Sequence, residues 1–258
     1  MEWFITMLGL PEAVGLVDVT VLAVASFFAS MLSAAAGIGG GVALLAVMAQ
    51  ILPGLAIVPV HGAVQWGSIA GRVVLLRAHV NWQLVLYFLV GSVVGAFIGG
   101  QVVVSLPVAY IQLILGVFIL YSTWGPKPKL ERANEKVLLV CGLLSTILTM
   151  FVGATGPFVS VVLKRMNLGK FIQVATMSSC LVFQHSAKVV VFALLGFSFA
   201  PYVPLIVLLV AVGFVGTVIG RQLLDRISEA LFTKILSVVL TLLAVRLLWF
   251  AGNQLLVG

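Results

Sequence analysis

Apolar residues fill this chain in long runs that are bounded by charged residues, glycines and prolines. A helix that crosses the hydrocarbon core of a bilayer needs about 20 mostly apolar residues. Most of the runs are close to that length, so the pattern predicts an all-α polytopic membrane protein. The predicted helices cover residues 15–36, 41–52, 60–78, 82–104, 108–124, 137–153, 157–164, 171–197, 203–221 and 231–251.

Two of the predicted helices, 41–52 and 157–164, are too short to cross a bilayer alone. Each begins at the end of a glycine cluster, GIGGG at 37–41 and GATGP at 153–157. Short segments interrupted by glycine or proline, at matching places in two halves of a chain, are typical of transporters built from repeats. We therefore expect a Gly-broken helix or a re-entrant hairpin at each cluster, and the sequence alone leaves both alternatives open.

The two halves of the chain match when one is shifted along the other. A shift of 116 positions aligns the two glycine clusters and also aligns AGRVV with SAKVV. The matches predict an internal duplication within a single transmembrane domain, residues 1–258. Repeat one spans about 15–124 and repeat two about 137–252, joined by a cytoplasmic loop at 125–136. The matched segments are 37–41 with 153–157, 70–74 with 186–190 and, after about five inserted residues, 95–101 with 216–222.

The cations along the chain predict its orientation. Eleven of the fourteen Lys and Arg residues lie in or beside four connections, whereas the connections near 53–59, 105–107 and 198–204 carry none. Connections rich in Lys and Arg lie on the cytoplasmic side of a membrane. Their alternation places both termini outside and gives the two halves opposite orientations, which predicts two inverted repeats. Alternating access can be built on that architecture.

The composition supports burial in lipid. Hydrophobic residues make up 62% of the chain and charged residues 8%, whereas globular proteins average about 45–50% and about 25%. These values exclude a nucleic-acid binder and most soluble enzymes, and we assign the net charge of +7 to basic cytoplasmic loops. Cys141 and Cys180 lie in apolar stretches, so we expect no disulfide, no metal site and no cofactor.

The glycine clusters form the first candidate site. Irregular backbone at membrane depth is tolerated only where it is buried in protein or lines a cavity. In the second cluster, Pro157 suits the first turn of a new helix, and a helix start offers free N–H groups and partial positive charge to an anion. The alternative is that these glycines only let helices pack closely. The candidate residues are Gly37, Gly39, Gly40, Gly41, Gly153, Thr155 and Gly156.

Three cations lie inside apolar segments, and no Asp or Glu lies comparably deep. A charge at the bilayer centre costs at least about 2.5–3.5 kcal/mol on insertion scales, so it normally has a partner or a function. We predict that an anionic substrate is the missing partner. Lys188 lies farthest from the ends of its segment and is the strongest candidate. Arg72 aligns with Lys188 but is also able to reach the cytoplasmic headgroups, and for Arg246 the headgroup interpretation is favoured.

Polar side chains accompany both of the aligned cations at helical spacing. Amide, hydroxyl and imidazole groups can hydrogen-bond a polar substrate, and the alternative is that they join helices to one another. The histidine in each group has a pKa suited to proton coupling. The residues are His61, Gln65 and Ser68 before Arg72, and Gln184 and His185 before Lys188.

Glycines also recur at every fourth residue within one predicted helix, at Gly91, Gly95 and Gly99. Gly216 and Gly220 repeat the pattern in the second half of the chain. Small residues at this spacing let two helix backbones approach each other closely. We therefore predict that these glycines are packing contacts and that they take no part in a binding site.

Three motifs resemble the TauE/SafE family: GIGGG at 37–41, GATGPF at 153–158 and the basic turn RAHVNW at 77–82. The resemblance extends over roughly residues 15–250 and includes the two-half layout. It implies a bacterial inner-membrane permease for sulfite, sulfoacetate or another organosulfur anion, and it does not select one of them. Thr155 and Pro157 replace glycines of the first cluster, which puts strict functional symmetry of the halves in doubt.

The residues and the resemblance together predict a multi-pass secondary transporter of the cell membrane that moves a small anion by alternating access. The predicted partners are that anion and the bilayer, and a homo-oligomer remains an open alternative. A passive anion channel is the competing function; ohmic currents would favour it, whereas saturable flux with counterflow favours a carrier. A membrane-embedded enzyme is disfavoured because HExxH, G-x-S-x-G and a deep Asp pair are absent, so no catalytic residue is assigned.

Overall fold

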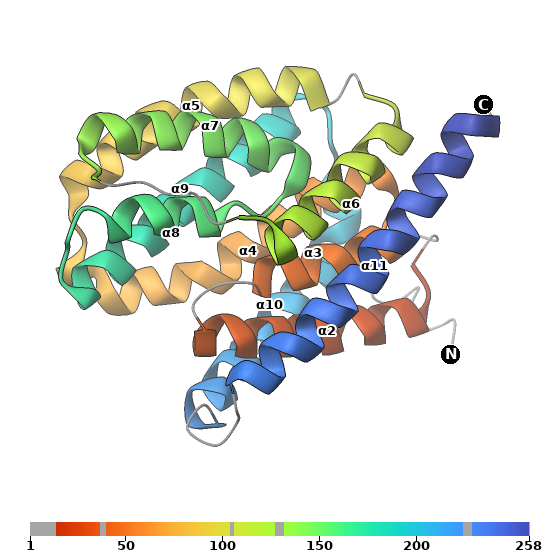
Figure 1. Ribbon diagram of the computed structural model, residues 1–258, viewed down its shortest axis with the longest axis horizontal. Helices are drawn as coiled ribbons and strands as arrows, with labels where there is room; N and C mark the ends of the chain where they lie inside the picture. The colour runs from red at the N-terminus through yellow and green to blue at the C-terminus, as the bar shows by residue number, and fades with distance from the viewer. Residues whose placement is uncertain (1–13, 37–39, 104–105, 127–131, 224–228, 258) are drawn as a thin grey trace.

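The computed structural model describes residues 14–36, 40–103, 106–126, 132–223 and 229–257, which form α-helices and short 3₁₀ turns without a β-strand (Figure 1). Six of these helices, α2, α5, α7, α9, α10 and α11, are long and apolar enough to cross a membrane. The prediction of an all-α polytopic membrane protein is thereby confirmed. The helices are α2 Leu16–Ala36, α3 Gly40–Ile51, α4 Gly54–Leu76, α5 Trp82–Val103, α6 Val108–Trp124, α7 Glu135–Val152, α8 Gly156–Lys164, α9 Lys170–Leu194, α10 Val203–Leu223 and α11 Glu229–Val257, with 3₁₀ turns η1 Arg77–His79 and η2 Ala200–Tyr202.

The expected connection at 53–59 is the one clear error in the predicted boundaries. Helix α4 already begins at Gly54, directly after its N-cap Pro53, and it continues through Pro59. A proline at the boundary of a helix removes no hydrogen bond that the helix needs. Pro59 lies in the second turn, where its missing N–H deprives only the carbonyl of Leu55 of its usual donor.

The packing of helices follows the division of the chain into two halves. Helices α2 to α6 correspond in order to α7 to α11. Helix α2 packs against α10 and α7 packs against α5, while the corresponding helices α4 and α9 contact each other, as do α6 and α11 (Figure 1). A duplicated chain is expected to show such reciprocal pairs. The inverted orientation of the two halves in the membrane stays a prediction.

The glycine repeats on α5 and α10 are sites of close backbone approach. A Cβ atom on Gly95 would collide with the carbonyl oxygen of Leu143 in α7, and one on Gly216 would collide with that of Phe27 in α2. Leu143 and Phe27 are 116 positions apart, the shift that aligns the two halves. Both contacts support the packing role that the sequence predicts for these glycines.

The two helix breaks meet inside the molecule. A Cβ atom on Gly41, at the start of α3, would lie 3.7 Å from the Cβ atom of Ala154, which precedes α8. Helix α3 has 12 residues and α8 has nine, about 18 Å and about 14 Å at 1.5 Å per residue. Neither helix is long enough to cross a hydrocarbon core of about 30 Å. Each therefore spans only part of its thickness.

The helix ends that the structure describes fall into a basic end and an opposite end, whose described connections carry no Lys or Arg. The turn that carries Arg77 contacts α9, where the rings of His79 and Phe171 lie 5.5 Å apart and Thr176 accepts a hydrogen bond from the backbone of Asn81. Helix α9 follows Lys164 and Arg165, so these cations share the basic end. At the other end, the starts of α4 and α6 pack together at Gly54.

We predict that Gly95→Ala and Gly216→Ala each destabilise the fold by about 1–3 kcal/mol, the usual effect of overpacking. The new methyl groups would meet backbone carbonyl oxygens that cannot move aside easily. Gly71→Ala is the matched control, because a Cβ atom there meets nothing within 4 Å. Thermal unfolding of the three purified variants measures the effect, and equal melting temperatures would contradict it.

Candidate functional site

A cavity of about 240 Å³ lies where the starts of α3 and α8 face α2, α4 and α9. We call it the basic cavity, because two of its wall residues, Arg72 and Lys164, are cations near the basic end. Among the residues that the structure describes, its walls carry no carboxylate and are rich in hydroxyl groups. The polar wall residues are Ser30, Ser33, Gln65, Ser68, Arg72, Thr155, Ser160, Lys164, Gln173, Ser178, His185 and Thr217.

Both broken helices begin at the wall of this cavity. Gly40 and Gly41 open α3, and Gly156 opens α8 directly after its N-cap Thr155. The Thr155 side chain does not cap the start of α8, and its hydroxyl donates a hydrogen bond to Oε1 of Gln184 at 3.2 Å. The first turn of α8 therefore presents its positive end to the cavity.

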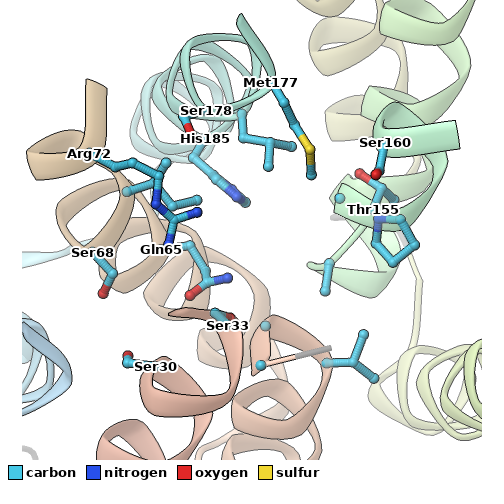
Figure 2. Close-up of a pocket in the computed structure, with 18 of the residues that line it drawn as sticks. Ser30, Ser33, Gln65, Ser68, Arg72, Thr155, Ser160, Met177, Ser178 and His185 are labelled. Atoms are coloured by element: carbon cyan, nitrogen blue, oxygen red, sulfur yellow. The ribbon is translucent and has the colours of Figure 1, made fainter. Parts of the chain in front are cut away.

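Charged and titratable side chains enter the cavity from α4 and α9. Figure 2 shows the Arg72 guanidinium and the His185 ring pointing into the cavity, with Thr155 and Ser160 on the opposite wall. His185 is only 3% exposed, and its Nδ1 atom has no hydrogen-bond partner among the residues that the structure describes. The Ser68 hydroxyl also has no hydrogen-bond partner among these residues. The cavity therefore contains polar groups with which a ligand is able to form hydrogen bonds.

Gln184 lies behind the cavity wall and joins three helices. Its Nε2 atom donates to the hydroxyl oxygens of Ser145 and Thr146 at 3.0 Å and 2.9 Å, and its Oε1 atom accepts from Thr155. Thr146 donates in turn to Ser92 on α5 at 3.0 Å. This buried network fixes the position of Thr155, and hence of the start of α8.

Lys188 is completely buried, and its ammonium group lies against the end of α7. Helix α7 ends at Gly153, whose φ of 75° turns its carbonyl away from the helix. The Nζ atom of Lys188 donates to that carbonyl at 3.1 Å and to the Thr149 hydroxyl at 3.5 Å. Its aliphatic chain passes Gly62 on α4, where a Cβ atom would lie 2.5 Å from Cε. Lys188 is therefore behind the basic cavity and does not line it.

His61 lies beside the other helix break, at the start of α3. Its Nε2–H donates to the carbonyl of Gly41 at 2.9 Å, since a carbonyl oxygen can only accept. Its Nδ1 atom faces Gly153, where an added Cβ atom would lie 3.1 Å away. The imidazole thus supports the backbone at the meeting point of the two breaks.

The structure divides the predicted site residues into two layers. Eight line the cavity, four lie directly behind it, and Gly37 and Gly39 lie outside the described residues. The lining residues are Gly40, Gly41, Gln65, Ser68, Arg72, Thr155, Gly156 and His185. The second layer consists of His61, Gly153, Gln184 and Lys188.

Sequence reasoning missed most of the hydroxyl groups in the cavity wall. Ser30 and Ser33 on α2 follow Ser26 at helical spacing, and that stripe is a signal that could have been noticed. Arg246 has a different environment from Arg72, since its side chain is exposed on α11 and lies 5.4 Å from the centre of the Phe250 ring. It is remote from the walls of the basic cavity.

A family model described as sulfite exporter TauE/SafE matches residues 22–247. The chain belongs to the TauE/SafE family. No curated protein and no solved structure was found to match it. The sequence resemblance is thereby confirmed. TauE/SafE proteins are membrane transporters. Together with the six helices that are long and apolar enough to cross a membrane, the family indicates a multi-pass membrane protein.

We predict that Gln184→Leu lowers the stability of the folded protein by about 1–3 kcal/mol, because three buried hydroxyl groups lose a partner. Ser186→Ala, on the same helix, is the control; its hydroxyl donates only to the Val182 carbonyl of α9 itself at 2.9 Å. Thermal unfolding compares the two. A Gln184→Leu protein as stable as the control would show that the network contributes little.

Proposed function

We propose that the protein is a secondary transporter that binds a small anion, sulfite or another organosulfur anion, in the basic cavity and moves it by alternating access. One observation carries the proposal: the starts of two broken helices and the Arg72 guanidinium converge on one cavity. This convergence provides backbone donors, helix-dipole charge and a fixed cation for the same ligand.

The charges of the cavity support an anion over a cation. Arg72 and Lys164 belong to its wall, and no Asp or Glu from the described part of the chain does. A site for a cation usually needs carboxylates or rings of carbonyl oxygens. Hydroxyl groups such as those of Ser68, Thr155 and Ser178 can donate hydrogen bonds to several oxygens of one anion, which suits an oxidised sulfur compound.

The position of the cavity supports loading from the cytoplasm. Lys164 ends α8 at the basic end, and Arg72 lies one turn before the turn that carries Arg77. Basic connections lie on the cytoplasmic side of a membrane. The cavity thus faces the side from which an exporter collects its substrate, in agreement with the family description.

We predict that Arg72→Gln reduces anion transport about 10- to 100-fold, because a charged hydrogen bond contributes about 1.5–3 kcal/mol. Arg246→Gln removes an equal charge from the exposed surface of α11 and is expected to transport at the normal rate. Counterflow of radiolabelled anion into liposomes that contain each purified variant measures both rates.

The substrate screen uses sulfite, sulfoacetate, taurine, thiosulfate, sulfate and a carboxylate in the same liposomes. Saturable counterflow of at least one sulfur anion supports the proposed function. Equal rates for Arg72→Gln and Arg246→Gln would remove Arg72 from the site. Ohmic currents without counterflow would replace the carrier with a channel.

A further inference from the structure

A second cavity of about 290 Å³ lies toward the end opposite the basic one. We call it the apolar cavity, because the described residues of its walls are apolar side chains and glycines. It is bordered by the first turns of α4, the end of α5, the start of α6 and the end of α9. The residues that define it are Leu55, Pro59, Val103, Ile111, Phe192 and Phe197.

One face of α9 connects the two cavities. Leu181 and His185 line the basic cavity, and Phe192 and Leu195 line the apolar cavity. Lys188 lies between these pairs at spacings of i, i+4, i+7, i+11 and i+14, which place all five residues on the same side of a helix. The lysine is therefore on the line that joins the cavities.

Helix α4, which packs against α9, has the same arrangement. Pro59 lines the apolar cavity, Gln65 lines the basic cavity, and His61 and Gly62 lie between them. The separation is six residues on α4 and seven on α9, from His185 to Phe192. At 1.5 Å per residue, the barrier between the cavities is about 9–11 Å thick.

The side chain of Lys188 fills this barrier. It passes Gly62, whose missing side chain leaves room for it, and its ammonium group binds the Gly153 carbonyl at 3.1 Å. Leu45 and His61 pack against Gly153 from the other side. A thin barrier that contains a flexible cationic side chain has the properties expected of a gate.

We propose that Lys188 is the gate of the transport path and that the apolar cavity is the second half of this path. The inference rests on the proposed function and extends it. In the closed state the ammonium group binds two neutral oxygens, those of Gly153 and Thr149. An anion that leaves the basic cavity toward the barrier is a stronger partner than a carbonyl, so it draws the lysine away from Gly153 during its passage, and not while it rests in the basic cavity, and opens the barrier. The lysine then supplies the charge that the apolar cavity lacks.

The first test separates binding from movement in Lys188→Met, which keeps the length of the side chain and removes its charge. Sulfite binding, measured as ligand-dependent thermal stabilisation, is expected to change less than about 3-fold, because the basic cavity is intact. Sulfite counterflow is expected to slow at least about 10-fold, since a charged hydrogen-bonding partner is lost. Loss of both binding and counterflow would show that Lys188 is a direct ligand of the anion. Retention of both would show that Lys188 has no role in transport. Either result would overturn the proposal that Lys188 is the gate.

A second variant keeps the test decisive if Lys188→Met does not fold. Gly62→Ala retains the lysine but places a Cβ atom 2.5 Å from its Cε atom, which displaces the ammonium group from Gly153. We expect an altered counterflow rate, by at least about 3-fold, with unchanged sulfite binding. Gly71→Ala on the same helix is the matched control, because it introduces no contact within 4 Å. Identical counterflow in the two variants would overturn the gate.

The experiments distinguish an incorrect gate hypothesis from an incorrect proposed function. If the unmodified protein neither binds nor exchanges sulfite, the proposed function fails for this anion and the gate fails with it. If the unmodified protein does both, and Arg72→Gln loses binding while Lys188→Met and Gly62→Ala behave normally, the basic cavity is the site and Lys188 is only a structural residue.

Discussion

A polar group at membrane depth needs a partner within the protein, because lipid offers none, and this constraint organises the interior. The two helix breaks expose backbone that a continuous helix would satisfy itself. The structure buries the breaks against each other, and it brings His61 to the carbonyl of Gly41 and Lys188 to that of Gly153. Lys188 thus satisfies a carbonyl that the break after α7 leaves open, and His61 adds a hydrogen bond to a carbonyl in the first turn of α3. The Gln184 network then fixes the start of α8 against α9.

The same constraint indicates where a ligand binds. In the described part of the chain, the Ser68 hydroxyl and Nδ1 of His185, both on residues of the basic cavity, have no hydrogen-bond partner, and Nδ1 of His61 behind the cavity has none either. Burial of such atoms is unfavourable unless water or a ligand reaches them. The start of α8, which the Thr155 side chain does not cap, adds partial positive charge in the same place. A molecule that satisfies all of them must be small, rich in acceptors and negative, since Arg72 and Lys164 border the same space.

Much of this fold could be predicted from the sequence, because apolar runs and glycine breaks are local signals. The helix at 108–124 was predicted with its observed bounds, and the one at 82–104 ends one residue earlier. Helix α4 starts at Gly54, before the predicted residue 60, because a proline usually marks a helix boundary, whereas this helix tolerates Pro59 early in its course. Spacing also identified Gln65, Ser68 and Arg72 as one stripe. The partner of Lys188 could not be predicted, because it depends on the left-handed turn at Gly153 and on the packing of α7 against α9. Thr217 and Ser30 enter the site only through the pairing of α2 with α10.

The positions of Arg72 and Lys188 bear directly on how the two halves work together. The two cations align in the duplicated sequence, but in this structure Arg72 lines an accessible cavity and Lys188 lies in the barrier. In an inverted repeat each half adopts in turn the conformation that the other half had, so aligned residues exchange environments between the two states. If the predicted inversion holds, the state that faces the opposite side of the membrane has Lys188 in its open cavity and Arg72 in its barrier. The departure of Lys188 from Gly153 is then half of a reciprocal exchange, and a buried lysine without an acidic partner is what such an exchange requires.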